Sequence, residues 1–182
     1  AAQVYSNNLA DFVPADRRRM ALLSLIELRL TQGSVADAAR LLDGFLSSQP
    51  DEAASDVALL TSGELKLKQH LLSLETNSAE AISLPAEATN QLRQALAQFD
   101  RLLGSYTNSP LRGKAQLNRG WCLWLEHRIP ESAAAFSTAV GLLPLSEDQA
   151  VARFKLGDAL YLQGDHTNAL QNYRAIIIDF AG

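Results

Sequence analysis

The chain has 182 residues, of which 47% are apolar and 20% are charged, and its formal net charge is −4. This composition is typical of a folded globular chain and excludes a disordered one. The acidic balance argues against nucleic-acid binding, and no run approaches the roughly 18 apolar residues that a transmembrane helix needs. Because Cys122 is the one cysteine, an internal disulfide is excluded.

Apolar residues spaced three and four apart predict helices along the whole chain, and no segment alternates with the period of two that marks a strand. Residues 1–13 are expected to form the second helix of a hairpin whose first helix is missing. Four helical hairpins are expected to follow, with helices at 16–32 and 35–48, 51–73 and 86–105, 110–126 and 130–143, and 147–163 and 166–180. Two helix starts have local signals, Ser109 before Pro110 and a capping box from Ser146 to Gln149.

Two recurrences indicate that these hairpins are copies of one unit. A small residue is followed twelve positions later by a proline in the segments 2–14, 38–50 and 132–144. In the later units a glycine is followed after twelve positions by a small residue and after sixteen by an aromatic one. These residues are Gly157, Ala169 and Tyr173 in the last unit, and Gly120, Ser132 and Phe136 in the unit before it. Such a period is typical of a solenoid, whose hairpins are stable only when stacked.

The last unit resembles the tetratricopeptide repeat family. The residues that carry the likeness are Leu156, Gly157, Tyr161, Gly164, Asp165, Ala169 and Tyr173. Its glycine lies 37 residues after Gly120, three more than the roughly 34 of that repeat. The N-terminal unit fits only through Gly33, Ala38, Leu42 and Pro50, because Ile26 stands at the position of the first glycine.

The resemblance implies an all-α fold, a right-handed superhelical solenoid of antiparallel helical hairpins with about four and a half repeats. We expect one solenoid fragment over residues 1–182 whose parent protein continues in both directions. Its expected parts are a trailing helix of a preceding repeat at 1–14 and four repeats at 16–50, 51–108, 109–146 and 147–182.

The second repeat carries an insertion of about twenty residues near 70–89, since Gly63 finds its matching small and aromatic residues only at Ala95 and Phe99. Residues 75–84 are expected to form a loop, after which Pro85 begins the resumed helix. A longer, protruding hairpin would result. An insertion of this length is often functional, but a plain surface loop is an equal alternative.

The sequence contains no recognisable catalytic or metal-binding constellation. His70, His127 and His166 are far apart, and each is expected near a helix end. Cys122 is expected to be a buried, inert thiol. These observations predict a protein that is no enzyme and has no metal site and no cofactor.

In the family that the chain resembles, the first helix of each hairpin lines a concave groove that receives a peptide or another protein. The residues expected to bind a partner there are Glu64, Lys114, Asn118, Trp121, Trp124, Phe154, Lys155, Asp158 and Tyr161. Glu27 would add a further carboxylate. The alternative for the two tryptophans is a place in the core, since aromatic residues at helical spacing usually pack inside. Some members of the family bind the C-terminal carboxylate of a chaperone through a clamp of basic and amide side chains. Lys114, Asn118 and Lys155 match this clamp only in part, so chaperone tails are not expected partners.

The leading function is therefore a protein-binding scaffold. One alternative is a structural module that self-associates through exposed terminal helices, which the mostly apolar segment 175–180 favours. Another alternative is a docking or regulatory segment of a larger enzyme. Residues 99–124 resemble the inter-repeat junction of bacterial cell-envelope repeat proteins of the Tol-Pal and outer-membrane-assembly type. That likeness implies the bacterial periplasm or cell envelope, with the cytoplasm as the alternative.

Overall fold

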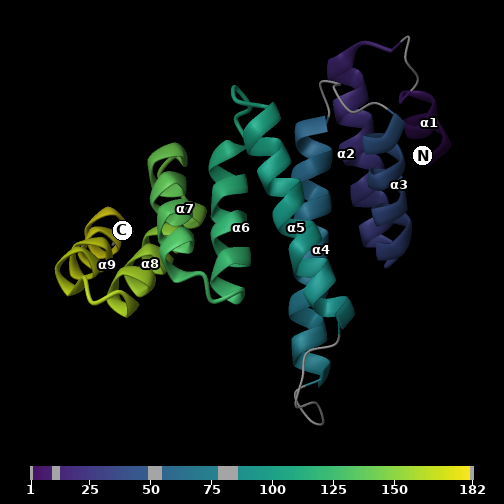
Figure 1. Ribbon diagram of the computed structural model, residues 1–182. Coiled ribbons are helices and arrows are strands. Elements are labelled where there is room, and N and C mark those ends of the chain that lie inside the picture. The colour runs from purple at the N-terminus through teal and green to yellow at the C-terminus, as the bar shows by residue number, and fades with distance from the viewer. Residues whose placement is uncertain (1, 10–12, 49–54, 78–85, 181–182) are drawn as a thin grey trace.

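The computed structural model describes residues 2–9, 13–48, 55–77 and 86–180, which contain helices and no strand. The helices are α1 (Ala2–Asn7), α2 (Ala15–Thr31), α3 (Val35–Ser48), α4 (Ser55–Asn77), α5 (Ala86–Ser105), α6 (Arg112–Leu125), α7 (Ile129–Leu142), α8 (Glu147–Leu162) and α9 (His166–Phe180) (Figure 1). The all-α fold expected from the apolar spacing is confirmed.

After α1 the helices pair into four antiparallel hairpins, α2–α3, α4–α5, α6–α7 and α8–α9, which stack in chain order (Figure 1). The first helices of these hairpins, α2, α4, α6 and α8, also contact one another in succession. Within the described residues, successive second helices make no such contact. The layer of first helices is therefore the more closely spaced one, which places it on the inner, concave side of the stack.

The buried side chains form two cores that meet at α6. One extends from α2 to α6 and includes Leu42 and Phe99, while the other joins α6, α7 and α8 around Phe136 and Ala159. Trp121 is half-buried and packs against both. Neighbouring hairpins thus share one core, as expected of stacked repeats.

Within three hairpins, a glycine of the first helix lets an aromatic ring of the second helix lie on its backbone. A Cβ added to Gly63, Gly120 or Gly157 would lie 2.5 Å from the ring of Phe99, Phe136 or Tyr173, respectively. That is well inside normal van der Waals contact. In α2–α3, Ile26 and Leu42 occupy the equivalent positions, and both are buried.

Seven positions after Ile26, Gly120 and Gly157 the backbone adopts a positive φ and the first helix ends. Gly33 and Gly164 adopt left-handed backbone angles, with φ of 71° and 81°, as expected for helix-terminating glycines. His127 holds the equivalent place in α6–α7 and also has a positive φ, 58°. In the second hairpin the equivalent residue is His70, which stays inside α4 and is 2% exposed. The expectation that His70 lies near a helix end is therefore wrong, because α4 continues past that point.

The second hairpin is longer than its neighbours, as the insertion predicts. Helix α4 has 23 residues and α5 has 20, whereas α6 and α7 have 14 each, and the pair projects beyond the rest of the stack (Figure 1). The loop expected at 75–84 starts later than predicted, since α4 is helical through Asn77. Residues 78–85, with the expected helix start at Pro85, lie outside the described residues.

The helix expected over residues 1–13 is much shorter. Helix α1 ends at Asn7, and Asn8 and Leu9 form a turn. The Asn8 side-chain amide donates to the carbonyl of Val4 at 3.1 Å, a local bond of the kind that competes with helix continuation. Val13, which precedes Pro14, is also outside a helix, consistent with the restriction that proline places on the residue before it.

The two expected helix-start signals are both present, but α6 begins later than expected and the capping box of α8 is only half formed. Helix α6 begins at Arg112, two residues after Pro110, because Ser109 holds the intervening turn. Its hydroxyl accepts from the Leu111 N–H at 3.1 Å and donates to Asp56 at 2.5 Å. At α8, Ser146 caps the helix by accepting from the Gln149 N–H at 3.4 Å. The reciprocal half of that box is absent, since the Gln149 amide donates instead to two carbonyls at the end of α7.

Candidate partner-binding groove

The concave face is lined by equivalent residues of the four first helices. Glu27, Glu64, Trp121 and Asp158 occupy the same place in successive units, since they are separated by 37, 57 and 37 residues, the middle interval including the insertion. Side chains at this place and one turn away form the surface that we call the groove.

The N-terminal half of the groove is an apolar trough between α2 and α4. It consists of two adjoining hollows of about 580 and 260 Å³, which share Leu30 and Thr61. Leu23, Leu30 and Leu72 line it and are 42%, 39% and 50% exposed. The sequence reasoning named only Glu27 and Glu64 in this region; the spacing of Leu23 and Leu30, four before and three after Glu27, is the signal that it missed.

Glu64 lies at the junction between the two halves. Its Oε1 accepts from the Asn118 side-chain amide at 2.8 Å, which links α4 to α6. Burial raises the pKa of Glu64, and the hydrogen bond from Asn118 opposes that shift. The structure therefore brings these two predicted groove residues together and leaves an incompletely compensated carboxylate on the groove.

The C-terminal half is aromatic, and a lysine lies over its rings. The Lys155 ammonium is 4.6 Å from the Trp124 ring centroid, 5.0 Å from that of Trp121 and 5.7 Å from that of Phe154. It also forms an ion pair with Asp158 at 2.8 Å. Such cation–π contacts strengthen when the cation is removed from water, and the Lys155 side chain is only 16% exposed.

The two tryptophans differ from the other aromatic residues of the groove in exposure. Trp121 and Trp124 are half-buried, and Trp121 meets Phe136 edge-on with ring centroids 6.2 Å apart. Phe154 and Tyr161 are 51% and 59% exposed. The tryptophans thus contribute to the junction between α6 and α8, while the accessible aromatic surface belongs to α8.

The remaining predicted charges are already engaged within the protein. The Lys114 ammonium binds Asp148 at 2.5 Å, which ties α6 to α8. Asp158 accepts from Lys155 and, at 2.8 Å, from the Tyr173 hydroxyl. Burial and this hydrogen bond raise the pKa of Tyr173 to about 12, so the phenol stays a donor. Asp158 is consequently less open to a partner's cation than Glu64.

The histidines and the cysteine of the described residues lie in no group of three His, Cys, Asp or Glu side chains that could hold a metal ion. Burial raises the pKa of Cys122 to about 12, so its thiol remains protonated. His127 lies in the α6–α7 turn, and the centroid of the His166 ring is 4.8 Å from that of Tyr161, with the rings tilted by 55°. None of the described helices is long and apolar enough to cross a membrane.

A stack of helical hairpins whose first helices form an inner layer defines the class of helical repeat solenoids. Models of the tetratricopeptide repeat match residues 86–147 and 151–182, which together make up more than half of the chain. The chain therefore belongs to the tetratricopeptide repeat family, whose members generally serve as protein–protein interaction scaffolds.

Solved structures share this fold at low sequence identity. MamA residues 41 to the end from Desulfovibrio magneticus RS-1 gives a TM-score of 0.63 at 16% identity, covering 97% of this chain and 93% of that one. The TPR-like repeats of a Podosopora anserina kinesin light chain give 0.62 at 12% identity, covering 99% and 82%. No curated protein sequence matches significantly. These likenesses establish the fold, and they give no support to the further resemblance to Tol-Pal repeats.

Proposed function

We propose that this protein is a non-catalytic scaffold that binds a segment of a partner protein along the groove. The observation that carries the proposal is the repetition of exposed apolar side chains at both ends of the inner layer. Leu23 and Phe154 hold one equivalent place in the repeat, and Leu30 and Tyr161 hold another. Accessible apolar surface gathered in this way is typical of an interaction site.

The groove offers two apolar anchor points separated by a polar middle. Leu23 and Leu30 form the first anchor and Phe154 and Tyr161 the second, while Glu64 lies between them. A partner segment with apolar residues toward both ends would fit this pattern. Its stretch near α4 would favour a basic side chain, because a cation beside Glu64 offsets the cost of its buried charge.

Affinity measurements on groove variants test this proposal. Peptides would be selected on the immobilised protein from a random library, and the affinity of the strongest binder would be measured for wild type, Leu30→Ala and Tyr161→Ala. Loss of an anchor residue is expected to weaken binding roughly 30-fold, as a hot-spot residue does. Leu142→Ala is the matched control, because Leu142 is an exposed leucine on α7, outside the groove. Equal affinities for all four proteins would contradict the proposal.

Self-association through the terminal helix is the second candidate. Ile177 and Ile178 on α9 are 68% and 78% exposed, which favours burial of this face against another copy. Sedimentation of wild type and Ile178→Asp at high concentration distinguishes the two functions. A self-assembling module should lose its larger species in the variant, whereas a groove scaffold should sediment as a monomer in both forms.

The cell envelope of a bacterium is the location that we propose, with the likeness of residues 99–124 to envelope repeats as its support. The cytoplasm is the alternative. Fractionation of the source cells, followed by detection of the protein with an antibody, decides between them.

A further inference from the structure

A separate hollow of about 640 Å³ lies where hairpin α4–α5 passes the tip of hairpin α6–α7. Because α4 and α5 are longer than α6, they continue beyond the α6–α7 turn (Figure 1). Leu92 and Leu96 of α5 and Leu125 of α6 supply its apolar lining. We call this hollow the α5 pocket.

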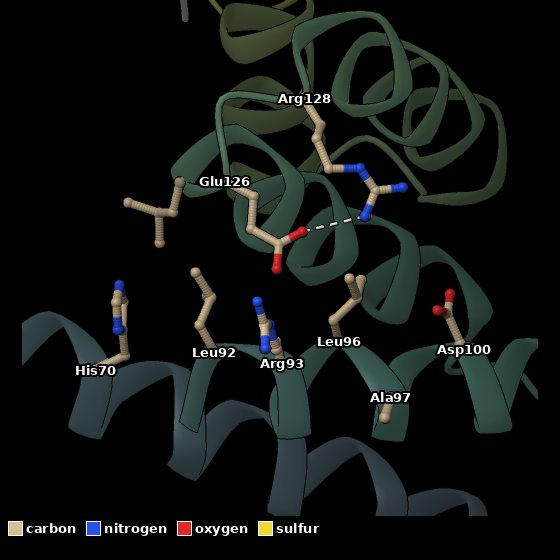
Figure 2. A pocket seen from close by; sticks show the side chains of 9 residues that line it. His70, Leu92, Arg93, Leu96, Ala97, Asp100, Glu126 and Arg128 are labelled. Carbon is tan, nitrogen blue, oxygen red and sulfur yellow. Dashed lines mark hydrogen bonds and ion pairs between the residues drawn. The ribbon is translucent and has the colours of Figure 1, made fainter. Parts of the chain in front are cut away.

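Four charged side chains, Arg93, Asp100, Glu126 and Arg128, line the pocket beside the apolar residues, and all but Arg93 are paired. Asp100 accepts from Arg119 at 2.6 Å, and Glu126 accepts from Arg128 at 3.1 Å. Arg93 has no ion pair or hydrogen bond within the described part of the chain, and Figure 2 shows it extending from α5 toward the side of the pocket that carries Glu126. The charge left without a partner is thus a guanidinium, which suits a carboxylate.

We propose that the α5 pocket docks a protein segment in which a carboxylate lies next to a leucine-sized apolar side chain. Arg93 would bind the carboxylate, and the apolar side chain would contact Leu92, Leu96 and Leu125. The volume is within the range of about 300 to 1,000 Å³ that ligand pockets occupy. Since Arg93, Ala97 and Asp100 are exposed along α5, the pocket is open enough for a chain to enter and leave.

This site goes beyond the groove, since most of its lining comes from second helix α5 and from the α6–α7 turn, with His70 of α4 and Leu125 at the end of α6 completing it. It assigns a role to the insertion, which lengthens the hairpin so that α5 extends past its neighbour.

Nuclear magnetic resonance with ¹⁵N-labelled protein tests the proposal directly. The probe is acetyl-Gly-Leu-Asp-Leu-Gly-amide, and the matched peptide has Asn in place of Asp. We expect the Asp peptide to shift the backbone amides of Leu92, Arg93, Leu96 and Glu126 in a saturable way. Arg93→Gln should weaken that binding roughly five-fold, the effect of losing a partly exposed charge pair. Arg101→Gln is the control, because Arg101 is an exposed arginine of α5 that does not line the pocket.

The proposal is overturned if the Asp peptide shifts no pocket amides, or shifts only residues of the groove. It is also overturned if Asp and Asn peptides bind alike, or if Arg93→Gln and Arg101→Gln have the same effect. Circular dichroism of both variants checks that the fold is intact. Tyr161→Ala should leave binding to the pocket unchanged, so failure here and failure of the groove proposal are separable.

Discussion

Replacing Gly157 with alanine perturbs the contact that sets the spacing of α8 and α9. The new Cβ would lie 2.5 Å from Cε1 and 2.8 Å from Cζ of Tyr173, so the ring must move by about 1 Å to reach normal contact. Such overpacking typically costs roughly 1 to 3 kcal/mol. The movement also strains the 2.8 Å hydrogen bond from Tyr173 to Asp158. Alanine offsets up to about 1 kcal/mol of this cost through helix propensity, so the net destabilisation should be about 0 to 2 kcal/mol before the strained hydrogen bond is added.

The matched control is Gly44→Ala on α3, where an added Cβ meets nothing within 4 Å. That variant should be stabilised by up to about 1 kcal/mol, since only the propensity effect operates. Thermal unfolding followed by circular dichroism measures both, and each kcal/mol should move Tm by about 2 to 4 °C in a chain of this size. If Gly157→Ala were as stable as Gly44→Ala, the close approach of α8 and α9 would be refuted.

Three further predictions concern single side chains. The raised pKa of Cys122 predicts that a thiol reagent at pH 8 labels it only after unfolding; rapid labelling of the native protein would contradict its burial. The folded pKa of Glu64 is raised above its usual 4.5. The contribution of Glu64 to the free energy of unfolding is therefore fully present below that pH and is lost as the pH rises through the folded pKa. Glu64→Gln should therefore raise Tm at pH 7 but not at pH 4, and a lower Tm at pH 7 would refute this. Lys155→Ala should expose the indoles of Trp121 and Trp124, so acrylamide should quench their fluorescence more strongly; unchanged quenching would show that Lys155 does not cover them.

The fold could be predicted because its signals are local and repeat. Gly157 and Tyr173 are sixteen residues apart, and this spacing recurs at Gly120 and Phe136, so the pairing of helices follows from counting. Helix ends were harder to predict, since they depend on side-chain competition. The Asn8 side chain bonds to the Val4 carbonyl at the end of α1, and Ser109 is held by Asp56 from a distant part of the chain.

The groove could be predicted only in outline. The spacing of the repeats identified which face of the first helices lines the groove, and Asn118 and Glu64 do meet there. It could not show that Lys155 lies over the tryptophans or that Asp158 binds Tyr173, because both contacts depend on how the helices pack. The trough at Leu23 and Leu30 was missed for a related reason: an apolar residue on a helix reads as core until the packing shows that it stays exposed.

The central claim is that the inner layer of first helices receives the partner segment. Backbone amide shifts in ¹⁵N-labelled protein, recorded while the strongest selected peptide is added, test it most directly. The account predicts that the largest shifts fall on α2, α4, α6 and α8, around Leu30, Glu64 and Tyr161. Shifts concentrated on the second helices α3, α7 and α9, with these three residues unaffected, would contradict it.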